Sequence, residues 1–349
     1  MNKQLQYNSP FWIWGGLGFY NCYASVYMHM QKENGCAVAL DRPEDFAENL
    51  NNLFETMAGQ TLTRSSWSKE PTAMEKELAL RFGNGSNATD ELVDFIVGFT
   101  GYEYKKITAD FKQAVMDSIH AGKPVIAKLK ADDWESCLGK GYRVIIGYDE
   151  DALLEPNYVY DPNGTPAKPI TYDQIEWLYL FGDKTAQKYT MLDVLKQMEK
   201  IMNSDFSQGI WVDFAYRFDF EHGDWGKTVA QVKERFARLE DMGWDLSCMS
   251  HSLQNATGDR ELLQSLGLNV KQHDELITTL GEQTHLLHNL GYQANALRES
   301  AFAFQLNDEQ EWPWNLNGLI TSTAMVIDAV MECEMKILLA IKKAIRKFQ

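Results

Sequence analysis

The chain has 349 residues, and 33 Lys and Arg against 49 Asp and Glu leave a formal net charge of −16. With 45% apolar residues it has the composition of a globular protein rather than a disordered one, and its length predicts about two domains. The acidic balance argues against a general nucleic-acid binder and against docking on anionic membranes, because both require a basic surface.

Helical spacing dominates the first 120 residues. Residues 18–30 are typical of the start of a buried helix, and Asp41 with Pro43 precedes a second helix whose apolar positions run from Phe46 to Met57. The same spacing predicts helices at residues 71–81, 89–99 and 108–121, the last of which stops at Gly122.

After residue 122 the pattern of residue types changes from helical spacing to one typical of strands. Residues 125–129, 142–148 and 158–160 are short, rich in β-branched and aromatic types, and separated by turn residues. Since the helices come first and the strand cluster follows with tight loops, the order favours an α+β fold over a doubly wound sheet.

The second half is predicted to be helical. Thr190 begins a pattern resembling a capping box, an apolar stripe runs from Val229 to Leu239, and a last helix covers residues 320–345. Gly267, Gly281 and Gly291 interrupt this half, so its helices are expected to be short or bent there. Charged residues within the apolar stretch 318–345 argue against a membrane-spanning helix.

The five cysteines are odd in number and form no CxxC pair, which argues against a disulfide framework or a zinc ribbon. The N-terminus lacks the layout of a signal peptide. We therefore expect a cytoplasmic protein with free thiols and without a cofactor. Glu282, His285 and His288 could form a metal site on one helix, but without a second ligand cluster a helix-surface position is the favoured interpretation, and no metal is predicted.

Two segments could contain the chemistry. The first is GGLGFYNC at residues 15–22, where a glycine-rich loop leads to Cys22 at the start of a helix; the partial positive charge there can lower a thiol pKa and hold an oxyanion. The second is GYRVIIGYD at residues 141–149, followed by YVYDPNG at residues 158–164. The alternatives are that Cys22 is a small buried residue of a central helix and that Asp161 only opens a turn.

Together these segments resemble the papain-like fold of the C39-like peptidases, and more closely the butirosin biosynthesis protein H N-terminal domain family. The resemblance covers about residues 10–185 and implies a papain-like N-terminal domain at residues 1–203, followed by an all-α domain at residues 204–349. In these families a Cys opens the central helix, a strand ending in Gly-Tyr-Asp brings a His to it, and an Asp-Pro supplies the acid that orients the His. Cys22 matches the nucleophile and Asp161 the acid.

Two of the four family elements are absent. The position of the His is Gly141, and the chain has no His between residues 121 and 221. The Gln that donates to the oxyanion in the family is replaced by Gly16. Without an imidazole, Cys22 would depend on the helix dipole for activation. Tyr142 and Arg143 lie beside the missing His and, with Gly16, are candidate substrate contacts, although Arg143 cannot exchange a proton.

The resemblance implies acyl transfer to an amine in bacterial secondary metabolism, with Cys22 accepting the acyl group. The alternative is a papain-like binding protein for a peptide or peptidyl chain that has lost catalysis, and a peptidase with a base from elsewhere, such as His222, is the least favoured. The expected partners are a small-molecule amine, a peptide or an acyl carrier protein, but neither nucleic acid nor membrane. The helical half could form a homo-oligomer.

Overall fold

The structure is a computed structural model that describes residues 2–7, 18–36, 41–59, 62, 73–84, 87–130, 141–156, 170–207 and 228–348. The chain divides into two compact units. The first, called the sheet unit, consists of Met1–Ala58, Ala79–Met191 and Ser265–Gly267, and the second, called the helical unit, of Gly59–Leu78, Leu192–Gln264 and Leu268–Gln349. The domains inferred from the sequence, 1–203 and 204–349, stay a prediction, because a compact unit is not by itself a family domain.

The helices predicted for the first 120 residues are confirmed to within a few residues. α1 is buried on almost all sides, as its run of aromatic and apolar residues requires of a central helix. α5 begins at the N-cap Thr89, whose hydroxyl accepts the Leu92 amide, and ends at Gly101 with a positive φ of 75°. The bounds are α1 Phe19–Glu33, α3 Pro43–Met57, α4 Ala73–Phe82, α5 Asp90–Thr100 and α6 Phe111–His120.

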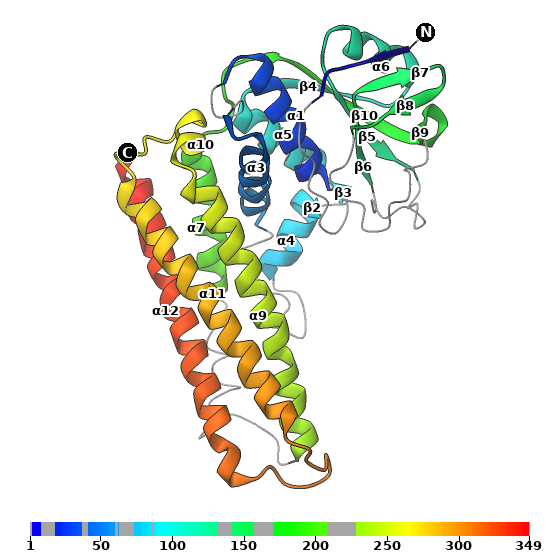
Figure 1. Ribbon diagram of the computed structural model, residues 1–349. Coiled ribbons are helices and arrows are strands. Elements are labelled where there is room, and N and C mark those ends of the chain that lie inside the picture. The colour runs from blue at the N-terminus through cyan, green and yellow to red at the C-terminus, as the bar shows by residue number, and fades with distance from the viewer. Residues whose placement is uncertain are drawn as a thin grey trace. The chain divides into compact units, whose positions relative to one another are not determined.

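Two small antiparallel sheets and a two-stranded ribbon accompany these helices, which makes the fold α+β. One sheet has the order β4-β10-β5-β6, and the other has the order β1-β7-β8-β9 (Figure 1). The bounds are β1 Asn2–Gln4, β2 Gly83–Asn84, β3 Asn87–Ala88, β4 Tyr102–Ile107, β5 Val125–Leu129, β6 Tyr142–Ile145, β7 Gly147–Asp149, β8 Ala152–Leu154, β9 Ile170–Thr171 and β10 Ile175–Lys184.

The strand predicted at residues 142–148 is in fact two strands in different sheets. β6 pairs with β5, whereas β7 pairs with β1 and β8. Both faces of the segment are buried, so the alternation of its residues does not separate a core face from a solvent face. The prediction at residues 125–129 is confirmed as β5, and the strand predicted at residues 158–160 lies outside the described residues.

The core of the sheet unit lies between α6 and these strands. Val115 and Ile119 of α6 pack with Val125 and Ala127 of β5 and with Ile145 of β6, all buried. α1 packs against α3 on one side and against β5 and β6 on the other. The residues singled out on α1 and on β6 are therefore brought together by the packing of one helix on one sheet.

The helical unit is built mainly from three long helices that run side by side (Figure 1). Their buried positions follow a spacing of three and four residues: on α9 from Val229 to Leu253, and on α12 from Ile320 to Ala344. This spacing is that of coiled-coil packing. The bounds are α7 Met191–Ser207, α9 Val229–Gly258, α10 Arg260–Ser265, α11 Asp274–Ala303 and α12 Asn317–Lys347.

Two of the three glycines at which short or bent helices are expected do not end a helix. α11 continues through Gly281 and Gly291, and only Gly267, with a φ of 90°, follows the end of a helix. Gly291 lies where α11 approaches α9, because a Cβ there would be 2.9 Å from the Gly243 carbonyl oxygen. The close packing of α11 on α9 stabilises the continuous helix, although glycine has a low helix propensity. Across the part of the chain that the structure describes, no helix combines the length and the apolar character needed to span a bilayer.

Candidate functional site

Cys22 lies in the second turn of α1, just past the free amides of the helix start. The N-cap is Gly18, whose N–H donates to the Asn21 side chain at 3.2 Å. The Cys22 N–H donates to the Gly18 carbonyl at 3.3 Å, which is an ordinary helical hydrogen bond. The unpaired amides of a helix lie in its first turn, before the first hydrogen bond within the helix. Because the Cys22 N–H already donates to Gly18, it is not available to stabilise an oxyanion.

The Cys22 thiol is enclosed. Its side chain is 0% exposed, and burial raises the pKa of the thiol well above its ordinary value, because a thiolate there would lose its hydration. The Arg143 guanidinium lowers this pKa and Glu155 raises it, each by less than burial does. Burial thus opposes the activation by the helix dipole that is one of the two interpretations of Cys22 from the sequence, and a catalytic role of Cys22 stays a prediction.

Tyr142 meets α1 from the first strand position of β6. Its ring contacts the Phe19 ring edge-on with centroids 5.7 Å apart, and its hydroxyl donates to the Ala88 carbonyl at 3.4 Å. The side chain is 0% exposed, and burial raises the pKa of the hydroxyl, with a smaller contribution from Cys22. Tyr142 is thus part of the core close to Cys22 rather than on an open surface, and its role as a substrate contact stays a prediction.

Arg143 and Glu155 form a buried ion pair next to Cys22. The Arg143 Nε lies 3.6 Å from Glu155 Oε1, and the two side chains are 4% and 10% exposed. Arg143 also donates from one terminal nitrogen to the Tyr142 carbonyl at 2.8 Å. A buried guanidinium needs such partners, because an unpaired charge in the interior is costly.

Glu155 is the residue of this cluster that the sequence analysis missed. It follows β8, whose hairpin with β7 returns the chain toward β6. The available signal was Arg143 itself: a charge within a run of β-branched and aromatic residues requires a counter-charge, and Glu155 is the first acidic residue beyond the hairpin turn.

A second polar group lies two residues before Cys22 on the same helix. The Tyr20 hydroxyl is buried and has no hydrogen-bond partner, and Glu55 of α3 and Tyr142 both raise its pKa in addition to burial. Burial also raises the pKa of Glu55, although Asn51 donates to its carboxylate at 3.1 Å and opposes the change. The region around Cys22 is therefore a core with embedded polar groups.

The described histidines near this region do not supply a base. His29 is buried, stacks on Tyr7 with ring centroids 4.8 Å apart, and has a pKa lowered mainly by burial. His120 lies at the end of α6, and its Nε2 is 2.9 Å from the Tyr148 hydroxyl. Among the described residues, no histidine is one of the groups that shift the pKa of Cys22.

Several predicted residues cannot be placed. Gly16, Asp161, His222 and Cys137 lie outside the described residues, so their predicted roles stay predictions. The other four cysteines are free thiols, with Cys248 exposed and Cys333 buried. Within the described ranges, no three His, Cys, Asp or Glu side chains gather as a metal site.

Comparison of the chain with models of known protein families gave no match, and comparison with curated proteins and with solved structures gave none either.

Proposed function

We propose that this chain is a non-catalytic binding protein of papain-like architecture that holds a peptide or peptidyl chain without covalent chemistry at Cys22. The single observation behind the proposal is the enclosed Cys22 thiol, 0% exposed and with its pKa raised by burial. A nucleophilic cysteine needs the opposite, a partly exposed and electropositive site that favours the thiolate.

The packing of α1 on β6 supports the papain-like part of the proposal. A papain-like fold needs a helix bearing the Cys to lie against the strand that would bear the His, and Cys22 of α1 and Tyr142 of β6 are neighbours of this kind. Where the family has its imidazole acting on the thiol, this chain has the pair of Arg143 and Glu155. An ion pair fixes the strand and the following hairpin but transfers no proton.

The net charge of −16 narrows the ligand class. A strongly acidic protein attracts cationic ligands at long range and repels anionic ones. We therefore propose a peptide or peptidyl chain with basic residues as the ligand. An acidic carrier protein suits this surface poorly.

Acyl transfer on Cys22 is the second candidate, because one observation favours it. The Arg143 guanidinium acts on the thiol and lowers its pKa, as a catalytic site would require. A small opening of the core around Cys22 would reduce the opposing effect of burial. The transfer would then proceed by attack of the thiolate on an acyl thioester, release of the thiol leaving group, and displacement of Cys22 by an amine.

Alkylation of the native protein separates the two candidates. Iodoacetamide labelling followed by peptide mass spectrometry reports each cysteine in one experiment. The exposed Cys248 is the matched reactive control, and the buried Cys333 is the matched inert control. We expect Cys22 to react at least about tenfold more slowly than Cys248, because each unit of raised pKa removes a factor of about ten in thiolate. Labelling of Cys22 faster than Cys248 contradicts the proposal and favours acyl transfer.

A second experiment tests binding directly. Immobilised wild-type protein and Cys22→Ala are exposed to a mixture of random synthetic hexapeptides, and the retained peptides are sequenced. We expect both proteins to retain the same basic peptides, and a simple acyl thioester to leave no mass adduct on Cys22. Retention of no peptide refutes the binding function, whereas a stable adduct on Cys22 refutes the loss of catalysis.

A further inference from the structure

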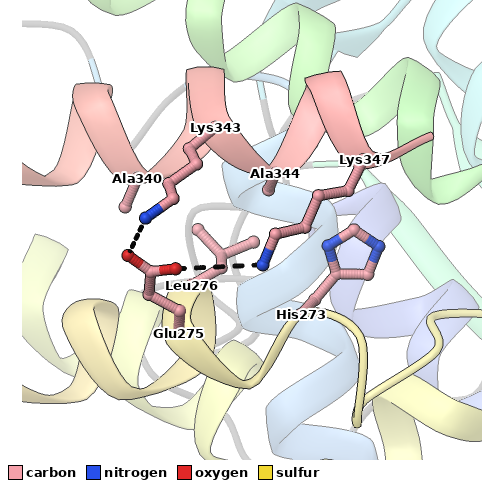
Figure 2. Close-up of a pocket in the computed structure, with 7 residues that line it drawn as sticks. All are labelled: His273, Glu275, Leu276, Ala340, Lys343, Ala344 and Lys347. Atoms are coloured by element: carbon pink, nitrogen blue, oxygen red, sulfur yellow. Dashed lines mark hydrogen bonds and ion pairs between the residues drawn. The ribbon is translucent and has the colours of Figure 1, made fainter. Parts of the chain in front are cut away.

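A small pocket in the helical unit lies between the first turn of α11 and the last two turns of α12 (Figure 2). Its polar lining comes from His273, Glu275, Lys343 and Lys347, and Leu276 with two alanines of α12 forms its apolar wall. The pocket is unrelated to Cys22, which belongs to the other unit.

His273 is the unusual member of this lining. Its side chain is 1% exposed, yet neither ring nitrogen has a hydrogen-bond partner. The ring stacks on Phe348 with centroids 4.5 Å apart and planes 19° apart, so its orientation is set by packing. A buried polar atom without a partner costs about 1–3 kcal/mol, and such atoms are rare in native proteins. His273 lines the pocket, and a ligand there would give a partner to the ring nitrogen on the side of Lys347 (Figure 2).

The charges around His273 favour an anion. Glu275 is paired with two ammonium groups, Lys343 Nζ at 2.5 Å and Lys347 Nζ at 3.8 Å, as the dashed lines in Figure 2 show. Two cations against one anion leave the lining with one positive charge in excess. His273 is also the N-cap of α11, whose N-terminus adds a partial positive charge, and the C-terminus of α12 on the opposite wall adds a partial negative one, so the excess charge comes from the lysines.

The dimensions of the pocket limit the ligand to a small one. Its volume of about 10 Å³ is small and favours a monatomic species over a polyatomic anion such as phosphate. The two ammonium groups disfavour a cation. Lys343 and Lys347 are 59% and 34% exposed, so an ion can enter along their side chains.

We propose that this pocket is a binding site for a small monovalent anion of the size of chloride, with His273 and Lys347 as its donors. The neutral His273 ring donates one N–H to the anion, and the Lys347 ammonium donates another. The anion balances the excess charge and fixes the end of α12 against the start of α11. The titratable groups that line the site are Glu275 of α11, Lys343 and Lys347 of α12, and His273 itself.

Proton binding and anion binding at this site are coupled. Burial and the charge of Lys347 lower the pKa of His273 in the empty pocket, so the ring is neutral at pH 7. A bound anion stabilises the protonated ring and raises this pKa, and by reciprocity the anion binds more tightly as the pH falls.

Nuclear magnetic resonance titration of the histidine rings tests the proposal in the wild-type protein. The pH titration is recorded in chloride and in gluconate, which is too large for the pocket, at equal ionic strength. We expect the pKa of His273 to be about one unit higher in chloride, a tenfold coupling, while the exposed His251 and His285 titrate identically in both salts. An unchanged pKa of His273, or equal changes at all histidines, overturns the proposal.

Two pairs of variants complete the test with thermal unfolding as the readout. His273→Phe keeps the stacking on Phe348 but has no donor, and His285→Phe on the same helix is its control. Lys347→Met removes the second donor, and Lys336→Met, which breaks the exposed pair with Glu332 on the same helix, is its control. We expect chloride, compared with gluconate, to stabilise the wild type and both controls but neither pocket variant. A chloride effect that survives in Lys347→Met overturns the proposal even if His273→Phe does not fold.

Discussion

Arg143 on β6 and Glu155 after β8 face each other inside the sheet unit, with Nε and Oε1 3.6 Å apart and both side chains almost excluded from solvent. The pair connects the two sheets, since β6 belongs to one and β8 to the other. It acts on the pKa of Cys22 in both directions, because Arg143 lowers this pKa and Glu155 raises it. The pair stabilises the packing beside the thiol and transfers no proton.

Removing one member of this pair is expected to destabilise the protein strongly. Glu155→Gln leaves the Arg143 charge buried without its carboxylate, and breaking a buried pair in this way costs about 3–5 kcal/mol. Urea unfolding of the variant measures the loss. The double variant Arg143→Met with Glu155→Leu is the control, and we expect it to regain most of the stability because no charge remains buried. Equal stability of Glu155→Gln and wild type contradicts the pair as observed.

Cys22 is expected to tolerate a small apolar residue better than a polar one. Cys22→Ala loses only the packing of one sulfur atom, whereas Cys22→Ser places a hydroxyl in an enclosed site at a cost of about 1–3 kcal/mol if it finds no partner. Thermal or urea unfolding of both variants shows which of the two is more stable. The same two substitutions at the exposed Cys248 should have almost no effect. If Cys22→Ser is the more stable variant, the thiol is not in an apolar enclosure.

Glu55 is expected to reduce stability at neutral pH. Its pKa is raised by burial from an ordinary value of 4.5, so the folded state binds the proton more tightly than the unfolded state does. Stability conferred by this group is therefore present below pH 4.5 and is lost as the pH rises through the folded pKa. Relative to wild type, Glu55→Gln should be more stable at pH 7 and similar at pH 4.

The pH dependence of that difference is the decisive measurement for Glu55. It is obtained from urea midpoints of the two proteins across the acidic range. Glu91→Gln, at an exposed position whose carboxylate pairs with Arg81, is the control and should show no such gain. A stability difference for Glu55→Gln that grows as the pH falls has the wrong sign and contradicts the buried state of the carboxyl group.

Two glycines of α11 are expected to respond oppositely to alanine. At Gly281 nothing lies within 4 Å of a new Cβ, so Gly281→Ala should stabilise the helix by about 0.5–1 kcal/mol. At Gly291 the new Cβ would meet the Gly243 carbonyl at 2.9 Å and the Ser247 hydroxyl at 3.2 Å. Gly291→Ala should then cost about 1–3 kcal/mol, because α9 and α11 must move apart. Each variant is the control for the other in thermal unfolding, and stabilisation by both contradicts the close approach.

The sequence alone predicts the elements whose pattern is local. The apolar run of α1, the stripe of α3 and the β-branched run of β5 all fold as their periods indicate. It also places Cys22, Tyr142 and Arg143 on the helix and the strand that meet. The longest strand, β10, and its neighbour β4 are not predicted, because the sequence YEYKKI of β4 mixes charges with its aromatic residues and gives no clear apolar face.

The helical unit also has features that the sequence predicts and others that only the tertiary packing explains. The stripe from Val229 to Leu239 and the apolar positions of residues 320–345 are visible in the sequence and predict helices there, whereas the length of α9 and its packing along α11 come from the structure. Glycine propensity argues against a continuous α11, and only the contact between Gly291 and Gly243 explains why the helix is not interrupted there. Local propensity is a weak effect, about 1 kcal/mol for one glycine, and tertiary packing exceeds it.

The state of Cys22 shows most clearly what sequence and tertiary structure each determine. Its place at the start of a helix follows from the sequence, because the apolar helical pattern begins directly after Gly18. Whether the thiol is reactive depends on how much water reaches it, and this is set by Tyr142, Arg143 and Glu155 arriving from strands more than a hundred residues away. Chain order determines which groups are available, but hydration and charge at an atom are properties of everything packed around it.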